Sequence, residues 1–297
     1  MENSQLLIYK EPELGCPHLV VALAGWADAA QVATKAMTYL VKKLGATRFA
    51  EIKPEEFYDF SSLRPVVTID RGSITSLKLP RNTFFYWQSH STAQDLVLLH
   101  GVEPQLHWHK FVSLILNLAD QLNVHRIYTL GGLYDRVPHT KEPRISGVVN
   151  QRHLTRTLEE HQIEPIVYQG PSSLHGLLLT DCADRGIQAI SLWGHAPFYV
   201  RVETNPMVCY SLVKKLAELL GIDLDLEELE KAGEYLRDML DQFLAQSKDL
   251  RAYVHKLEQE YELEGTALRE PPEGADRIIK EVEDFLREQR RKGETPP

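Results

Sequence analysis

Short apolar runs alternate with longer segments of helical periodicity along the first two thirds of the chain. Residues 18–24 are almost continuously apolar and end at Gly25, as a buried strand does, and residues 27–44 carry apolar positions at helical spacing. This alternation predicts a mainly parallel sheet with helices on both faces. Further strands are predicted at 66–69, 83–87, 95–100, 126–130 and 187–193, and further helices at 107–121 and from Asn205-Pro206 onward.

Several predicted strands between residues 47 and 88 lie close together and are separated by turn residues. Such spacing favours antiparallel hairpins, so we expect a mixed sheet rather than a purely parallel one. The predicted fold class is α/β, with three layers in the order helix, sheet, helix, and the core domain is expected to span residues 1–221.

The pattern changes after Gly221. Residues 222–297 carry apolar residues three or four apart within dense charge, which predicts an extension of amphipathic helices followed by a disordered tail at 290–297. This segment also holds the whole net charge of −9, because residues 1–221 contain 21 basic and 21 acidic residues. The narrow apolar stripes have two interpretations: they pack on the core domain of the same chain, or they dock on a neighbour.

Several functional classes are not supported. Neither part of the chain has a basic excess, so we expect no nucleic-acid partner. No apolar run approaches the ~20 residues of a membrane span, and the N-terminus lacks a secretory pattern. Because the three cysteines are also far apart, we expect a reduced, cytoplasmic protein.

Nucleotide-binding and hydrolase motifs are missing: the sequence has neither a glycine-rich phosphate loop nor a G-x-S-x-G elbow. His107 and His109 fall two positions apart in a predicted helix, where their side chains diverge, so we expect no metal. We also expect no cofactor, and an enzymatic activity is left open.

Polar and aromatic residues gather where predicted strands end. Ligands of open α/β sheets bind beyond the carboxyl ends of the strands, so we take Trp26, Asp28, Glu103, Arg144 and Asn205 as ligand-binding candidates in one crevice. Asp28 and Asn205 also suit helix caps, and Glu103 suits the first turn of a helix. Arg144 has two interpretations, an ion pair with Glu103 or a contact to an anion.

A series of motifs along residues 5–235 resembles the proteasome assembly chaperone 2 family, in the style of its uncharacterised bacterial members. Each motif is weak alone, but their number, order and spacing make the resemblance specific. The motifs are Gly25-Trp26-Ala27-Asp28-Ala29, Glu56-Phe57-Tyr58-Asp59-Phe60 with Arg64-Pro65, His100-Gly101-Val102-Glu103-Pro104 with Trp108, Val137-Pro138-His139-Thr140 with Arg144, Gly170-Pro171-Ser172, and residues 192–200 with Asn205-Pro206.

This resemblance implies an α/β fold similar to nucleoside phosphorylases, assembled as a homo-oligomer, and carries over no catalytic residues. Archaeal members that bind proteasomes end in a hydrophobic-Tyr-any residue motif. This sequence ends in Thr295-Pro296-Pro297, so we do not expect docking by that route.

Two functional hypotheses follow. The first is a non-catalytic, homo-oligomeric assembly or scaffold protein, a trimer rather than a dimer, whose helical extension docks on a neighbour and whose further partner is proteasome-related or another protein. The alternative is a small-molecule binding protein or enzyme that takes a nucleoside or an anion in a pocket at the strand ends.

Overall fold

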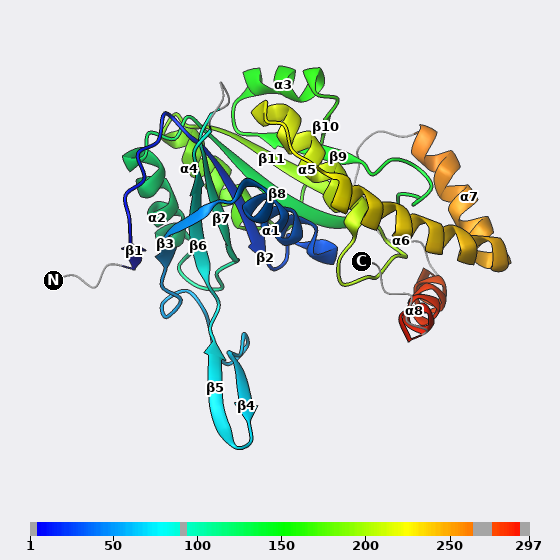
Figure 1. The fold of residues 1–297 in the computed structure, drawn as a ribbon. Helices are drawn as coiled ribbons and strands as arrows, with labels where there is room; N and C mark the ends of the chain where they lie inside the picture. The colour runs from blue at the N-terminus through cyan, green and yellow to red at the C-terminus, as the bar shows by residue number, and fades with distance from the viewer. Residues whose placement is uncertain (1–4, 90–93, 264–274, 292–297) are drawn as a thin grey trace.

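A nine-stranded mixed sheet forms the centre of the molecule (Figure 1). The computed structural model describes residues 5–89, 94–263 and 275–291. Across the sheet the strands lie in the order β1 (Leu6–Ile8), β3 (Thr47–Ile52), β6 (Asn82–Trp87), β7 (Leu96–Val102), β2 (His18–Ala24), β8 (Arg126–Asp135), β11 (Gln188–Pro197), β9 (Ile145–Val149) and β10 (Glu164–Pro165).

The middle of the sheet is parallel and its sides are mostly antiparallel. Strands β7, β2, β8 and β11 run parallel to one another, whereas β1, β3 and β6 on one side pair antiparallel with their neighbours. On the other side β9 pairs antiparallel with β11 and parallel with β10. The central strands are buried on both faces, which explains their continuous apolar runs. The predicted mixed α/β sheet is confirmed.

Helices cover both faces of this sheet and complete the three layers. One face packs against α1 (Val32–Leu44) and α5 (Pro206–Leu220), and the other against α2 (Trp108–Gln121) and α4 (Leu174–Asp184). The remaining helical segments of this part are η1 (Ala29–Gln31), η2 (Arg152–Leu154) and α3 (Thr155–Glu160).

Three element boundaries differ from the sequence prediction by more than three residues. Helix α1 begins at Val32 instead of residue 27, because Ala30 and Gln31 have positive φ angles and interrupt the helical backbone. Strands β8 and β11 continue through Gly131-Gly132 and Gly194, where the sequence predicts that they end. These glycines do not form turns. They admit a neighbouring side chain close to the strand, as shown by Trp193, whose ring a Cβ at Gly131 would approach to 2.6 Å.

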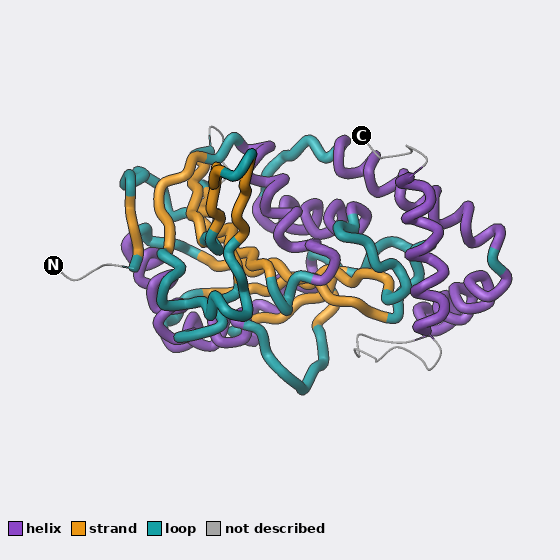
Figure 2. Tube along the Cα trace, turned by 90° about the horizontal axis from the view of Figure 1, so that it is seen from below, coloured by secondary structure: helices purple, strands orange, loops and turns teal. Residues whose placement is uncertain are grey.

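The extension consists of α6 (Glu227–Gln246), α7 (Lys248–Leu263) and α8 (Ala275–Arg291), gathered at one end of the molecule (Figure 2). Its described residues contain no strand, and the expected tail lies outside the described residues from 292 onward. The expectation that a neighbour covers the apolar stripes is wrong for the described helices, because the stripes are buried within the same chain. One cluster of buried hydrophobic side chains joins the core domain to the three helices. Its members are Tyr199, Val200, Val202 and Met207 of the core and Leu236, Met239, Leu240, Leu250, Val254, Leu257, Ile278, Val282 and Leu286 of the helices. A division into two folding units at residue 221 stays a prediction.

A separate hairpin, β4 (Val66–Asp70) and β5 (Ser73–Lys78), projects from the body of the molecule (Figure 1). Its strands pair only with each other, outside the nine-stranded sheet. Among the described residues, no helix is both long enough and apolar enough to cross a membrane.

Candidate functional site

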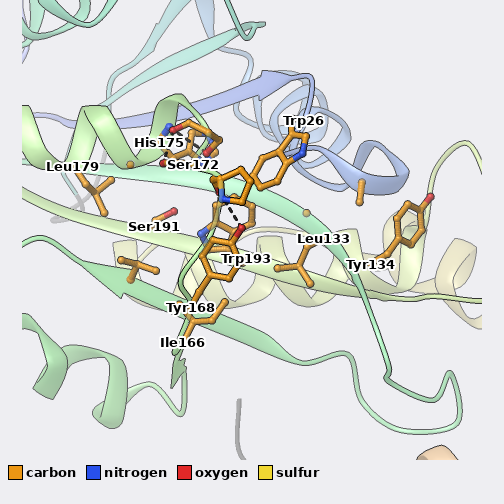
Figure 3. Close-up of a pocket in the computed structure, with 16 residues that line it drawn as sticks. Trp26, Leu133, Tyr134, Ile166, Tyr168, Ser172, His175, Leu179, Ser191 and Trp193 are labelled. Carbon is orange, nitrogen blue, oxygen red and sulfur yellow. Dashed lines mark hydrogen bonds between the residues drawn. The ribbon is translucent and has the colours of Figure 1, made fainter. Parts of the chain in front are cut away.

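A pocket of about 500 Å³ lies on the α4 side of the sheet, beside the ends of β8 and β11 (Figure 3). Its volume suits a small organic molecule. The lining residues come from the turn after β2, from strands β8, β9 and β11, from the segment 166–173 and from α4. They are Trp26, Ala29, Gly132, Leu133, Tyr134, Val148, Ile166, Tyr168, Pro171, Ser172, Ser173, His175, Gly176, Leu179, Ser191 and Trp193.

The pocket wall is mainly aromatic and aliphatic. Trp26 is 61 % exposed and Tyr168 is 48 % exposed, although both line the cavity. The Tyr168 hydroxyl donates to the carbonyl of Pro171 at 2.9 Å, which holds the ring across the pocket from Trp26 (Figure 3). Large exposed aromatic side chains at the rim of a cavity are typical of binding sites.

His175, in the first turn of α4, is the buried titratable group of this wall. It is 3 % exposed, and neither ring nitrogen has a hydrogen-bond partner among the described residues. Its ring lies 5.5 Å from that of Trp193, measured between centroids. Burial lowers the pKa of His175 to about 4, so the imidazole is neutral at pH 7.

Glu103 stands behind this wall and joins two of its parts. One carboxylate oxygen accepts a 2.6 Å hydrogen bond from the N–H of Leu174 at the start of α4, and the other accepts one of 3.3 Å from the N–H of Trp26. The structure therefore brings Glu103 and Trp26 together, as the sequence predicts. The carboxylate itself occupies the N-terminus of α4, the place where a bound anion would otherwise be favoured.

Asp28 and Asn205 are buried and hydrogen-bonded at helix starts. The Asp28 carboxylate accepts hydrogen bonds from the N–H groups of Ala33 and Thr34 and from the Thr34 hydroxyl. Burial raises the pKa of Asp28, against the opposing effect of these hydrogen bonds. The side chain of Asn205 accepts from the N–H of Val208 and caps α5.

The predicted ion pair of Arg144 with Glu103 is wrong, because Glu103 is bonded to the backbone of Trp26 and Leu174 and Arg144 pairs with another carboxylate. The Arg144 guanidinium forms an ion pair with Glu164 at 3.4 Å and lies over the ring of Tyr261 in α7 at 4.5 Å. Of the five candidates only Trp26 lines the pocket. A ligand-binding role for the other four stays a prediction.

Ser146, His195 and Asp135 form a buried hydrogen-bonded chain that the sequence does not predict. His195 Nε2 lies 2.7 Å from Ser146 Oγ, and its Nδ1 lies 2.7 Å from an Asp135 carboxylate oxygen. The order matches a serine, base and carboxylate relay. All three residues are at most 4 % exposed, and none lines the pocket.

Burial alone raises the pKa of the Asp135 carboxyl, but the hydrogen bond to His195 and the charge of His195 outweigh it. The resulting pKa lies below the usual range. Because β9 has little apolar periodicity, the sequence does not reveal that Ser146 sits in a strand beside His195. No group of three metal-binding side chains occurs within the described part of the chain.

Comparison with known proteins identifies the family. A model of the PAC2 family matches residues 22–244, which is most of the chain and includes nearly all of α6. The chain belongs to the PAC2 family.

Solved structures show the same family fold. A PAC2 family protein from Streptomyces avermitilis is 31 % identical, with a TM-score of 0.73, over 80 % of this chain and 99 % of that one. Rv2125 of Mycobacterium tuberculosis, described as a proteasome-assembly chaperone homologue, is 28 % identical with a TM-score of 0.73 over the same shares.

A curated relative matches over a shorter stretch. The uncharacterized protein MJ1210 of Methanocaldococcus jannaschii is 25 % identical over 131 residues, which is 43 % of this chain and 48 % of that protein. The chain therefore spans about half the length of this curated relative.

Proposed function

We propose that the protein is a homo-oligomeric, non-catalytic assembly chaperone of the PAC2 family, a trimer that works in the cytoplasm on a protein partner. Membership of the PAC2 family supports the chaperone role, and Rv2125 is described as a homologue of a proteasome-assembly chaperone. The three cysteines of the present chain are unpaired, which suits a reducing compartment. The burial of the Ser146–His195–Asp135 chain supports a role without catalysis.

The projecting hairpin carries the proposal of self-association. The register pairs Val67 with Leu77 and Ile69 with Ile74, and cross-strand partners share a face of a hairpin. These four side chains are 45 to 71 % exposed. The opposite face carries the polar pair Thr68 and Ser76 and the pair of Val66 with Lys78, so it is mainly polar. The hairpin thus presents one apolar face with nothing covering it in the described part of the chain.

A second copy of this chain is the proposed cover. An isolated two-stranded hairpin is marginally stable in water, so it needs a packing surface whenever the chain is folded. Another copy of the same protein is present whenever the protein is, so it can cover the apolar face permanently. A client protein binds and leaves, so it would cover the face only for part of the time. Closed rotational symmetry then gives a finite assembly.

The test compares two double variants of the hairpin by light scattering. Ile69→Asp with Ile74→Asp places two charges on the apolar face, and Thr68→Asp with Ser76→Asp places two charges on the polar face. We expect the native protein and the polar-face variant to be trimers and the apolar-face variant to dissociate. A native monomer, or equal behaviour of the two variants, contradicts the proposal.

The client is tested separately, with the purified trimer and unassembled proteasome subunits. We expect the protein to raise the rate at which the subunits form rings, measured by native mass spectrometry. The apolar-face variant is expected to lose this effect. An unchanged rate with the native trimer rejects proteasome subunits as the partner.

A further inference from the structure

The pocket beside α4 has features that a protein-docking surface does not need. It is a cavity of about 500 Å³, and a buried imidazole lines it. We propose that it binds an uncharged, planar aromatic or heteroaromatic molecule, whose ring lies among Trp26, Tyr168 and Trp193 and whose polar edge hydrogen-bonds to His175. This inference is independent of the hairpin and of the proposed chaperone role.

The arrangement of the walls supports a flat ring. Trp26 and Tyr168 approach the cavity from opposite sides, and Trp193 lies between them on β11 (Figure 3). Aromatic rings pack best against other rings in offset or edge-to-face contacts, which a planar ligand provides on several sides at once. The exposed faces of Trp26 and Tyr168 would also lose contact with water when the ligand binds.

His175 supplies the polar contact. Both ring nitrogens are covered in the structure, so the contact forms when the ring turns about its Cβ–Cγ bond and presents one of them to the cavity. A buried imidazole without a hydrogen-bond partner is costly, and water or a ligand usually satisfies such a group. In its neutral form the ring has one donor and one acceptor nitrogen, which matches an amide or a ring nitrogen of a heteroaromatic molecule. The backbone N–H of His175 is occupied by the Ser173 hydroxyl, so the free groups belong to its ring.

The charges of the site select against ions. None of the described lining residues is an acid, a lysine or an arginine. The N-terminus of α4, which would attract a phosphate or carboxylate, is already occupied by the Glu103 carboxylate. The described lining therefore offers neither an anion nor a cation a partner of opposite charge, and either ion would give up hydration on entering the cavity. Of the two ligand classes in the sequence-based alternative, this proposal favours the nucleoside-like one over the anion.

The binding experiment uses the full chain and two sets of matched probes. Nicotinamide, nicotinate and 1-methylnicotinamide share one ring and are neutral, anionic and cationic respectively. Indole-3-acetamide, indole-3-acetate and tryptamine form a second set. Saturation-transfer NMR and calorimetry measure the affinity of each probe at pH 7.5, where His175 is neutral.

Three variants connect binding with the pocket. His175→Phe keeps the ring and removes both nitrogens. Val148→Trp fills the mouth of the cavity, because Val148 lines it and is 36 % exposed. Val167→Trp makes the same change at an exposed residue outside the lining. Circular dichroism confirms that each variant is folded.

We expect at least one neutral probe to bind, and we expect the affinity of its charged analogues to be lower by about tenfold or by a larger factor. His175→Phe should weaken the neutral probe about five- to tenfold. Val148→Trp should abolish binding, and Val167→Trp should leave it unchanged. The proposal is overturned if no neutral probe binds at millimolar concentration, if a charged analogue binds as tightly, or if His175→Phe or Val148→Trp has no effect.

Discussion

The Glu103 carboxylate accepts a hydrogen bond of 2.6 Å from the backbone N–H of Leu174, across 71 residues of sequence. Its second oxygen accepts from Trp26, so one side chain connects the turn after β2 with the first turn of α4. These two segments form neighbouring parts of the pocket wall. A single carboxylate therefore connects two parts of the rim.

Glu103→Ala should lower the free energy of unfolding by about 1 to 2 kcal/mol, because two backbone N–H groups lose their acceptor. Glu103→Gln keeps one acceptor oxygen and should lose less. Urea denaturation measures both, with the exposed Glu55→Ala as the matched control. Equal stability of Glu103→Ala and Glu55→Ala would show that the connection contributes nothing.

His175 should make stability fall in acid. Its pKa is lowered from 6.5 to about 4 in the folded chain, so the unfolded state binds more protons between these values. Stability from this residue is fully present above pH 6.5 and is lost as the pH falls toward 4. His175→Phe should reduce the slope of unfolding free energy against pH in that window by up to about 1.4 kcal/mol per pH unit. Denaturation at several pH values measures it, and His109→Phe, at an exposed position, should leave the slope unchanged.

Gly131 leaves room for the Trp193 ring. A Cβ at Gly131 would lie 2.6 to 2.8 Å from three ring atoms, so Gly131→Ala should destabilise the protein by about 1 to 3 kcal/mol. The same change in a Trp193→Ala background should cost less, because the clash is gone. A double-mutant cycle by denaturation tests this coupling. Additive effects of the two changes would contradict it.

The hydrogen bonds among Ser146, His195 and Asp135 should stabilise the fold, and their contributions should depend on each other. Asp135→Asn and Ser146→Ala each leave His195 with an altered or missing partner, and each should cost about 1 to 3 kcal/mol. The double variant should cost less than the sum of the two. Denaturation curves give these values, with Ser76→Ala on the exposed hairpin as control. Full additivity would mean that the two contacts to His195 are independent.

Much of the fold could be predicted from local pattern. The buried runs of β2 and β7 and the periodicity of α2 and α5 depend on burial that each segment needs by itself, so their types are visible in the sequence. The helix cap at Asn205 is equally local. In contrast, the sequence pattern wrongly predicts strand ends at Gly131 and Gly194, because a turn and a close side-chain approach both require glycine.

The candidate site was predictable only in part. Trp26 and Glu103 follow neighbouring parallel strands, so the sequence brings them to one edge, and their contact follows from that. His175 and Tyr168 could not be found in this way, because nothing near them marks their segments as the opposite wall. Asp28, Arg144 and Asn205 share the strand-end signal, but their side chains are held by Thr34, Glu164 and the start of α5.

The sequence by itself determined the α/β class, the change to charged helices after Gly221 and the PAC2 resemblance, since these depend on residue type, spacing and order. The tertiary structure alone decided that the stripes of α6, α7 and α8 are buried on Tyr199 and its neighbours, and that the exposed apolar face lies on the β4–β5 hairpin. An apolar stripe indicates that one face of a helix must be buried, and only the packing of distant segments determines which surface buries it.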